Sequence, residues 1–319
     1  MVRVHRAHPH RDPGIRRIAA GSGFRFVDAR GNPVDAVARA RIDALVIPPA
    51  WTDVWISADP VGHIQAVGTD DAGRRQYIYH PAWTARRERG KFARALALAE
   101  ALPGIRGQVT RALRAPDITR ERVLAAAIRM LDAGALRIGG EQYLTAHGSH
   151  GLVTLQCRHA RVDEASVRLA FPAKSGQRME VTVDDPDLVA LLAELIRGRP
   201  RAPLLAYRRG RRRVPIRSRD VNGELARLSG GRFTAKDFRT LRGTIAAAQA
   251  LALHDHVDGA RGRAQAERLA AEAAAEVLGN TVAVARRSYI DPRVFERFER
   301  GRLLELDGSP EAALVRLLR

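Results

Sequence analysis

One tyrosine near the C-terminus is surrounded by the residue types that phosphate chemistry requires. Within residues 278–294, LGNTVAVARRSYIDPRV, the tyrosine is Tyr289 and its neighbours include the arginines Arg286, Arg287 and Arg293. Gly279 closes the alanine-rich helix expected before this stretch, and Pro292 cannot continue a helix, so the tyrosine lies in a short, bounded segment. A phenol among guanidinium groups indicates contact with a phosphate. The alternative is a half-buried core tyrosine whose hydroxyl finds a hydrogen-bond partner.

The charge of the chain indicates its partner. The chain has 54 basic and 35 acidic residues, a formal net charge of +19 and an isoelectric point near 11.4. Such an excess is typical of proteins that bind the phosphate backbone of nucleic acids. All but three of the basic residues are arginines, and the exceptions are Lys91, Lys174 and Lys236. We therefore expect duplex DNA as the partner, and each lysine is a candidate for a specific role.

Several common kinds of site are not expected in this sequence. The single cysteine, Cys157, permits no intramolecular disulfide, which is typical of a reducing compartment. No uncharged apolar run reaches about 18 residues, so we expect no membrane segment and predict a cytoplasmic, nucleoid-associated protein. No GxxxxGK[ST] phosphate loop and no paired-carboxylate motif occur, so no metal or other cofactor is predicted. His147, His150 and His159 lie near the cysteine, but their spacing matches no familiar zinc site.

Residues 1–85 are expected to form a small β-rich domain that clamps DNA. Short strand-like runs separated by Gly or Asp occupy residues 23–80, with one short helix inside ARARIDALVIPPAW. In the last run, RRQYIYH, Tyr77 and Tyr79 share one face of the strand and lie beside Gln76 and two arginines. These residue types suit contact with a groove and its sugar-phosphate backbone, and core tyrosines in an edge strand are the alternative. The basic tail before these strands is expected to be a flexible arm, and it contains His5, His8 and His10.

Residues 86–319 are expected to form a larger, mainly α-helical domain that carries a β-hairpin. Helical composition begins near this boundary, with a break expected at Pro103 and Gly104. SVRLAF and RMEVTV alternate apolar and polar residues about the turn PAKSGQ, which predicts a hairpin with Lys174 at its tip. The run 199–219 contains nine arginines and no acidic residue. It predicts an ordered basic hairpin against a duplex backbone.

A helix in the second domain begins with basic residues. Thr234 and Asp237 have the spacing of a capping box in FTAKDFRTLRGT, which places Lys236 and Arg239 in the first turns of the helix. The N-terminus of a helix carries partial positive charge, so cations are unfavourable there. The arrangement therefore predicts an anionic ligand.

Four separated sequence elements occur in an order that resembles one enzyme family. The elements are ALRIGGEQY, the hairpin lysine of PAKSGQ, KDFRTLRGT and SYIDPRV. In this order and at these intervals the chain resembles the type IB DNA topoisomerases, particularly their compact poxvirus-like and bacterial branch. The resemblance runs from the β-rich N-terminal region through Tyr289. It implies an α+β fold of the tyrosine-recombinase and type IB topoisomerase kind, and a bacterial enzyme expected to act as a monomer.

The resemblance assigns roles to individual residues. Tyr289 matches the nucleophile, Arg137 and Arg239 match the two catalytic arginines, and Lys174 matches the hairpin lysine. The family usually has a histidine nine residues before the tyrosine, and here that position is Asn280. Its amide can donate a hydrogen bond to a phosphate oxygen but brings no positive charge. Further residues match positions that contact DNA in the poxvirus-like enzymes, namely Gln76, Tyr77, Tyr79, Tyr143 and Lys236.

The expected chemistry agrees with these residue types. A phenol has a pKa of about 10, so at neutral pH it attacks a phosphodiester only where cations favour its phenolate and stabilise the transition state. Two guanidinium groups supply that charge in a geometry that fits nonbridging oxygens. A lysine on a hairpin can protonate the leaving 5′ oxygen. The resemblance implies a covalent 3′-phosphotyrosine that conserves the bond energy, so supercoiled DNA is relaxed without ATP or metal.

Two other functions are open from the sequence alone. A tyrosine recombinase or integrase shares the catalytic residue types. Recombinases, however, carry the pattern HxxR at the second arginine, with a histidine three residues before it. Here the residue three positions before Arg239 is Lys236. A noncatalytic basic DNA-binding protein that keeps only the scaffold is the other alternative. In such a protein, Tyr289→Phe would leave every DNA-linked activity intact.

Overall fold

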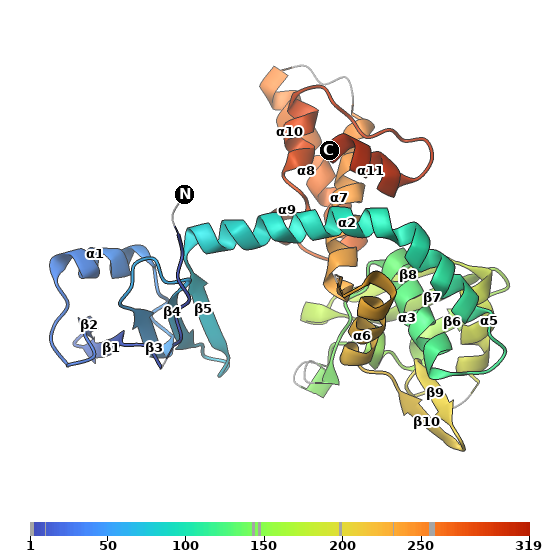
Figure 1. Ribbon diagram of the computed structural model, residues 1–319, viewed down its shortest axis with the longest axis horizontal. Coiled ribbons are helices and arrows are strands. Elements are labelled where there is room, and N and C mark those ends of the chain that lie inside the picture. Colours follow the sequence, from blue (N-terminus) through green and yellow to red (C-terminus); the bar gives the residue numbers. More distant parts are fainter. Residues whose placement is uncertain are drawn as a thin grey trace. The chain divides into compact units, whose positions relative to one another are not determined.

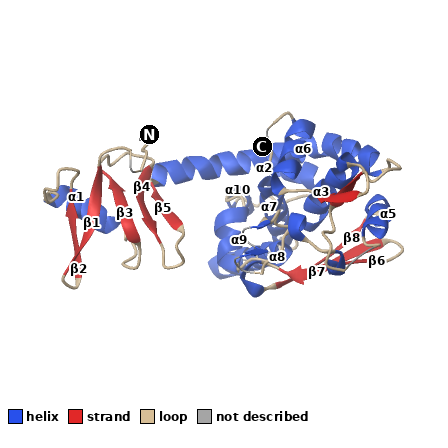
Figure 2. Cartoon of the chain, turned by 90° about the horizontal axis from the view of Figure 1, so that it is seen from below, coloured by secondary structure: helices blue, strands red, loops and turns tan. Residues whose placement is uncertain are grey.

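The computed structural model of the chain describes residues 3–9, 11–141, 144–145, 148–197, 200–231, 233–254 and 259–319. The chain divides into two units, Met1–Gly90 and Lys91–Arg319. The division falls inside helix α2 (Pro81–Leu113), whereas the sequence expectation placed it after residue 85. Figure 1 labels the elements and Figure 2 separates helices from strands.

The N-terminal unit is built on one antiparallel sheet with the strand order β2-β1-β3-β4-β5. Its strands are β1 (Gly14–Ala20), β2 (Gly23–Val27), β3 (Thr52–Ser57), β4 (Ile64–Thr69) and β5 (Arg75–Tyr79). Helix α1 (Ala36–Ala44) follows β2, and its Ile42 packs with Ile15, Phe26 and Ile56 of the sheet. The prediction of a small β-rich region with one short helix is therefore confirmed.

The N-terminal tail is tied to the sheet. The amide of His5 donates to the carbonyl of Val61 at 3.0 Å, and the carbonyl of His5 accepts from the amide of His63 at 2.8 Å. Ala7, 6% exposed, packs with Trp55 and other apolar residues of the sheet. The prediction of a flexible arm is wrong for residues 3–9, because these main-chain bonds and this apolar contact hold the segment. His10 lies outside the described residues.

The second unit is mainly helical. Besides α2, its helices are α3 (Arg120–Gly134), α5 (Pro186–Leu195), α6 (Ser218–Ser229), α7 (Ala235–Ala252), α8 (Gly259–Leu278), α9 (Val282–Tyr289), α10 (Arg293–Glu299) and α11 (Pro310–Leu318). Among the residues that the structure describes here, three short 3₁₀ turns also occur, namely η1 (Leu152–Thr154), η2 (Cys157–His159) and η3 (Lys174–Gly176). In the described part of the chain, no helix combines the length and the apolar character needed to cross a membrane.

Helix α2 passes through Pro103 without ending, so the predicted break is wrong. A proline inside a helix removes one main-chain hydrogen bond and costs about 3 kcal/mol. Leu98, Leu102, Ile105 and Val109 on this helix are each at most 2% exposed. Burying a side chain of this size contributes about 1.5–3 kcal/mol. The apolar stripe on both sides of the proline therefore outweighs the local preference for a break.

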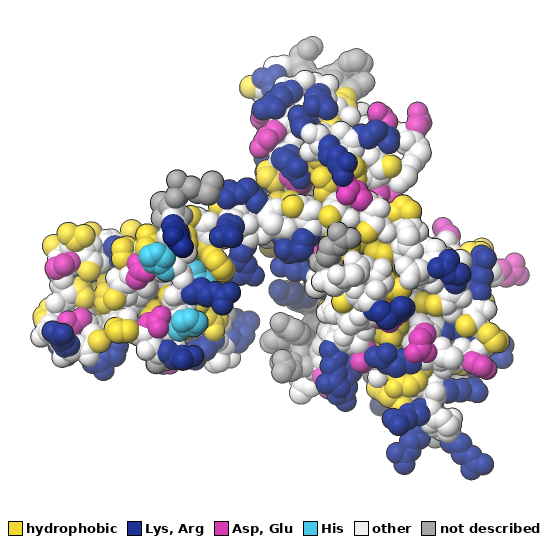
Figure 3. All heavy atoms as spheres, viewed as in Figure 1, with side chains coloured by type: hydrophobic (Ala, Val, Ile, Leu, Met, Phe, Trp, Pro, Cys, Tyr) yellow, Lys and Arg dark blue, Asp and Glu magenta, His cyan; other side chains and the backbone are white. Residues whose placement is uncertain are grey.

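Two hairpins lie in the described part of the second unit. A three-stranded sheet has the order β6-β7-β8, formed by β6 (Ala160–Val162), β7 (Ser166–Pro172) and β8 (Arg178–Asp184). The β7–β8 pair confirms the predicted hairpin with Lys174 at its tip. The second, β9 (Ala206–Arg209) with β10 (Arg212–Pro215), confirms the predicted basic hairpin. Figure 3, in the same view as Figure 1, shows basic side chains gathered on it.

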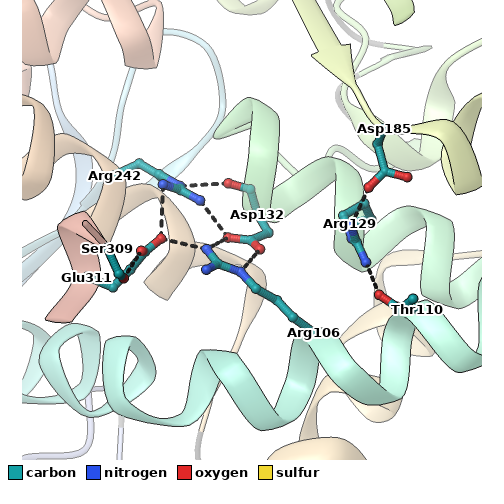
Figure 4. A network of polar contacts seen from close by, with 8 residues as sticks. All are labelled: Arg106, Thr110, Arg129, Asp132, Asp185, Arg242, Ser309 and Glu311. Atoms are coloured by element: carbon teal, nitrogen blue, oxygen red, sulfur yellow. Dashed lines mark hydrogen bonds and ion pairs between the residues drawn. The ribbon is translucent and has the colours of Figure 1, made fainter. Parts of the chain in front are cut away.

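An ionic network built on two buried carboxylates joins α2, α3, α7 and α11 (Figure 4). Arg106 donates to Asp132 at 2.7 Å and to Glu311 at 2.5 Å. Arg242 donates to the carboxylate and to the carbonyl oxygen of Asp132, both at 2.7 Å. Burial by itself raises the pKa of Glu311, but the hydrogen bond from Arg106 leads the opposing effects and holds that pKa at about 2. The network fastens the C-terminal helix to the helices that lead into the site described below.

Replacing Glu311 tests this network. Its folded-state pKa of about 2 lies below the ordinary 4.5, so its contribution to stability is present above pH 4.5 and is lost as the pH falls toward 2. The shift corresponds to about 3 kcal/mol at neutral pH. We expect Glu311→Gln to lower the free energy of unfolding by that amount at pH 7, and by much less near pH 3, in urea denaturation.

Glu305→Gln is the matched control, because Glu305 forms its ion pair with Arg316 at the surface and is 67% exposed in its side chain. Exposed pairs of this kind contribute about 0–1 kcal/mol. Equal losses at pH 7 and pH 3 for Glu311→Gln would contradict the assigned electrostatic origin.

Candidate active site

Tyr289 is the last residue of helix α9. Thr281 caps the start of this helix, accepting a hydrogen bond from the amide of Val284, and Pro292 prevents its continuation. The side chain of Tyr289 is half-buried, whereas Ile290 and Asp291 after it are 1% and 3% exposed. The backbone beyond the tyrosine is therefore anchored in the core, while the tyrosine itself keeps access to solvent.

Arg239 brings a buried guanidinium group to this tyrosine. The residue lies on α7, is 3% exposed, and places its Cζ 5.2 Å from the centre of the Tyr289 ring. Its two terminal nitrogens donate to the carbonyl oxygens of Ala135 and Leu278. Ala135 is the C-cap of α3 and Leu278 is the last residue of α8, so both oxygens belong to helix C-termini. Such carbonyls lack helical partners and carry partial negative charge.

Burial, and next the nearby charge of Arg137, lower the pKa of Arg239 to about 10, with Tyr289 acting in the opposite direction. The guanidinium therefore stays charged at neutral pH. No carboxylate among the described residues pairs with it, so its charge is available to a ligand. Its Nε is buried and has no hydrogen-bond partner in the described structure.

Arg137 reaches the same place from the segment that follows α3. Ala135 adopts a left-handed conformation with φ of 48°, which turns the chain sharply after the helix. The guanidinium of Arg137 donates to the carbonyl of Gly279 at 2.9 Å and to Oδ1 of Asn280. Burial lowers the pKa of Arg137, and the proximity of Tyr289 opposes this. Arg137, Arg239, Asn280 and Tyr289 therefore meet, although they come from four separate segments.

The bond to Arg137 fixes the orientation of the Asn280 amide. A guanidinium has only donors, so the oxygen of the amide must face it and the NH₂ group must point elsewhere. This Nδ2 is buried and lacks a partner among the described residues, like Nε of Arg239. A buried donor without a partner costs about 1–3 kcal/mol. Two such donors in one cluster indicate a missing acceptor, and an oxygen-rich anion satisfies that requirement.

Two glycines hold the backbone of Arg137 against a neighbouring loop. Gly139 has φ of +77°, and a Cβ on Gly151 would come within 2.6 Å of the Gly139 Cα and 2.8 Å of the Arg137 carbonyl oxygen. That carbonyl accepts a hydrogen bond of 2.9 Å from Leu152. Sequence reasoning missed this contact. The sequence shows the two glycines, in RIGG and SHG, but only the tertiary fold brings them together.

Lys174 lies at the exposed tip of the β7–β8 hairpin. The stem of this hairpin approaches the cluster, because Met179 Sδ lies 3.9 Å from the position of a Cβ built on Gly279, the residue before Asn280. Within the described residues, the ammonium group of Lys174 makes no hydrogen bond or ion pair. The structure thus places the hairpin beside the cluster and leaves the lysine available.

The residues expected to contact DNA are divided between the two units. In the N-terminal unit, Tyr77 is 44% exposed and its ring stacks on that of Tyr79 with centres 5.9 Å apart. Both lie on β5, at one edge of the sheet, and Gln76 donates to Asp70 at 2.8 Å. In the second unit, Lys236 is exposed in the first turn of α7. Tyr143 and His147 lie outside the described residues.

The remaining histidines of the suspected metal motif pack on each other. The rings of His150 and His159 have centres 4.4 Å apart, and Cys157 is buried near the carbonyl of Leu195. Burial lowers the pKa of His159 to about 4, with His150 as the next cause. Among the described residues, no group of three or more potential ligands is arranged to hold a metal ion.

The helical second unit thus presents a tyrosine among arginines. Residues 80–300 match the family model for the catalytic core of eukaryotic DNA topoisomerase I, and residues 23–70 match that for the N-terminal domain of bacterial DNA topoisomerase IB. The chain is 30% identical to DNA topoisomerase 1B of Acanthamoeba polyphaga mimivirus, covering 91% of this chain and 89% of that protein. It is 24% identical to DNA topoisomerase 1 of Mycosarcoma maydis, covering 54% of this chain and 19% of that protein.

The chain therefore belongs to the type IB DNA topoisomerases, which are isomerases that act on DNA.

The contact between Gly139 and Gly151 predicts that Gly151→Ala impairs activity. The added methyl group would displace the backbone of Arg137, and misplacement of a catalytic group by about 1 Å can cost about 100-fold in rate. We expect the rate of supercoil relaxation to fall by about 10- to 100-fold and the melting temperature to drop. Gly104→Ala is the control, since a Cβ there meets nothing within 4 Å. Native relaxation by Gly151→Ala would show that the close approach is not required.

Proposed function

We propose that this topoisomerase relaxes supercoiled duplex DNA by transient cleavage of one strand, with Tyr289 as the nucleophile. The observation that carries the proposal is the cluster of Arg137, Arg239 and Asn280 around this tyrosine, with two buried donors that lack partners. Its membership in the type IB family supplies the substrate class. The geometry supports this assignment more directly than sequence spacing alone.

In the cleavage step, Oη of Tyr289 bonds to a DNA phosphorus and the bond from that phosphorus to the 5′ oxygen breaks. The phenolic proton leaves to solvent and the 5′ oxygen takes a proton from a donor. The guanidinium groups of Arg137 and Arg239 stabilise the charge on the nonbridging oxygens of the transition state. Because their partners are neutral carbonyl and amide oxygens, no carboxylate of the residues that the structure describes competes with the phosphate.

Asn280 is proposed to donate its free Nδ2–H to a nonbridging oxygen. Arg137 holds the oxygen of the same amide, so the donor is oriented before DNA binds. This role uses a neutral hydrogen bond at the position where the family usually has a histidine. A neutral donor stabilises a developing negative charge less than a cation does.

Lys174 is proposed to protonate the leaving 5′ oxygen. An alkoxide is a poor leaving group, so a donor beside it accelerates cleavage. The exposed tip of a hairpin whose stem packs next to Gly279 is a suitable carrier for such a group, because it can enter a groove of bound DNA. Resealing reverses each step. The 3′-phosphotyrosine keeps the energy of the broken bond, so the proposed cycle consumes no ATP and requires no metal.

DNA binding is proposed to involve both units. Gln76, Tyr77, Tyr79, Tyr143 and Lys236 are the proposed contacts near the cleaved strand. The β9–β10 hairpin adds four exposed arginines that form no ion pair in the described structure, namely Arg208, Arg209, Arg211 and Arg212. Such residues bind phosphates without regard to sequence. We propose a monomer that clamps duplex DNA in the cytoplasm, in association with the nucleoid.

The nucleophile assignment predicts that Tyr289→Phe abolishes the covalent adduct while DNA binding survives. The ring and its contact with Arg239 are retained, and only the attacking oxygen is removed. End-labelled DNA trapped on a denaturing gel measures the adduct, and peptide mapping identifies the modified residue. Tyr207→Phe is the matched control, since Tyr207 lies on β9 and is no part of the cluster. An adduct formed by Tyr289→Phe would refute the proposal, and the noncatalytic alternative predicts no adduct in any variant.

The acid assignment predicts a substrate-dependent rescue of Lys174→Ala. A 5′-phosphorothiolate bond has a thiolate leaving group that requires no protonation. We expect Lys174→Ala to cleave normal DNA about 100-fold or more slowly and to cleave the phosphorothiolate at close to the native rate. Lys236→Ala should show no such rescue, because its expected defect is in phosphate binding. Slow cleavage of both substrates by Lys174→Ala would remove Lys174 as the general acid.

A further inference from the structure

One buried hydroxyl group holds the backbone on both sides of Ile290, the residue that follows Tyr289. Thr244 lies on α7 and is 2% exposed. Its Oγ1 lies 3.1 Å from the carbonyl oxygen of Tyr289, to which it donates, and it accepts a hydrogen bond of 3.1 Å from the amide of Asp291. The carbonyl of Thr240 is 2.8 Å away, so two carbonyl oxygens share the single hydroxyl proton.

We propose that Thr244 is a positioning residue for DNA cleavage, an inference that rests on the proposed role of Tyr289 as nucleophile. Tyr289 ends its helix, so its carbonyl has no partner within that helix. Asp291 is 3% exposed, which keeps water from its amide. Thr244 satisfies both groups at once and thereby sets the direction in which the chain leaves the nucleophile.

Thr244 also fixes the tyrosine relative to the cation. Arg239 lies on the same helix, five residues before Thr244, and its Cζ is 5.2 Å from the centre of the Tyr289 ring. A single rigid element therefore supplies both the guanidinium group and the hydroxyl that anchors the nucleophile's backbone. The spacing between phenol and guanidinium is set by α7 rather than by the short helix α9.

The neighbouring residue requires the same close approach. A Cβ added at Gly243 would lie 3.0 Å from the carbonyl oxygen and 3.2 Å from the Cβ of Tyr289, and 2.8 Å from Cδ1 of Leu278. Only a glycine lets α7 approach the tyrosine closely enough for the hydroxyl of Thr244 to reach it. On the other side, Lys91 donates to the carbonyl of Ser288 at 2.9 Å. The main chain is thus held at Ser288, at Tyr289 and at Asp291.

Three variants separate positioning from folding. Thr244→Val keeps the shape of the side chain and removes its hydroxyl, whereas Thr244→Ser keeps the hydroxyl. Thr240→Val is the matched control, because Thr240 is 0% exposed on the same helix and its hydroxyl bonds only to the carbonyl of Lys236 in the described structure. Single-turnover cleavage of end-labelled DNA by excess enzyme gives the rate constant, its amplitude gives the competent fraction, and equilibrium binding gives Kd.

We expect Thr244→Val to lower the cleavage rate constant by about 10- to 100-fold with little change in Kd. Thr244→Ser should restore most of the rate, and Thr240→Val should cleave at the native rate. A variant that only misfolds would lose amplitude and keep its rate constant. A native rate constant for Thr244→Val would overturn the proposal, as would an equal loss in Thr240→Val.

Gly243→Ala supplies the second test if Thr244→Val does not fold. It displaces the same backbone with the hydroxyl intact, so its rate constant must also fall at unchanged Kd, and a native rate would overturn the proposal. The result is distinguishable from failure of the nucleophile assignment. If Tyr289→Phe still forms the adduct, the nucleophile is another residue. If Tyr289→Phe forms none and Thr244→Val cleaves normally, only the role of Thr244 is wrong.

Discussion

The burial of a guanidinium group between the ends of two helices is the interaction on which the site depends. Arg239 binds the carbonyl oxygens of Ala135 and Leu278, at the C-termini of α3 and α8. These oxygens stabilise a cation without neutralising it, because they carry only partial charges. The contrast is with Arg106 and Arg242, whose carboxylate partners compensate their charge. The charges of Arg106 and Arg242 are therefore compensated within the fold, whereas that of Arg239 is not paired with a carboxylate of the described residues.

The same constraint explains why the site requires distant parts of the chain. Leu278, whose carbonyl oxygen binds Arg239, is the last residue of α8. Gly279 and Asn280 follow it directly and accept hydrogen bonds from Arg137. Ala135, whose carbonyl oxygen also binds Arg239, is the C-cap of α3, and Arg137 follows two residues later. Each helix end therefore both binds Arg239 and leads directly into another member of the cluster. The ionic network around Asp132 fixes α3 one turn before this point.

Local sequence signals predicted the parts of this arrangement but not their assembly. The alternating pattern around PAKSGQ is enough to predict the hairpin of Lys174, and Thr234 with Asp237 predicts the start of α7. Those features depend on residues close in the sequence. The contacts of Arg239 with residues 104 and 39 positions away depend on packing, as do the meeting of Gly139 and Gly151 and the hydroxyl of Thr244 against Tyr289. No local pattern encodes them.

The two mistaken expectations have the same origin. Local preference alone predicts a helix break at Pro103 and a flexible N-terminal tail. In both places, contacts with another element outweigh that preference and keep the segment ordered. The family resemblance predicted which residues belong together because it draws on the fold as a whole. Their roles in the reaction are a separate question, which depends on how the phosphate is held.

The amide at Asn280 has a consequence for how the enzyme responds to its surroundings. An imidazole at this position would gain or lose a proton within the range of pH that a cell experiences, whereas an amide does not. Arg137 and Arg239 also remain protonated across that range. Under the proposed roles, the donors assigned to the nonbridging phosphate oxygens, on Arg137, Arg239 and Asn280, would therefore keep a constant charge during metabolic acidification.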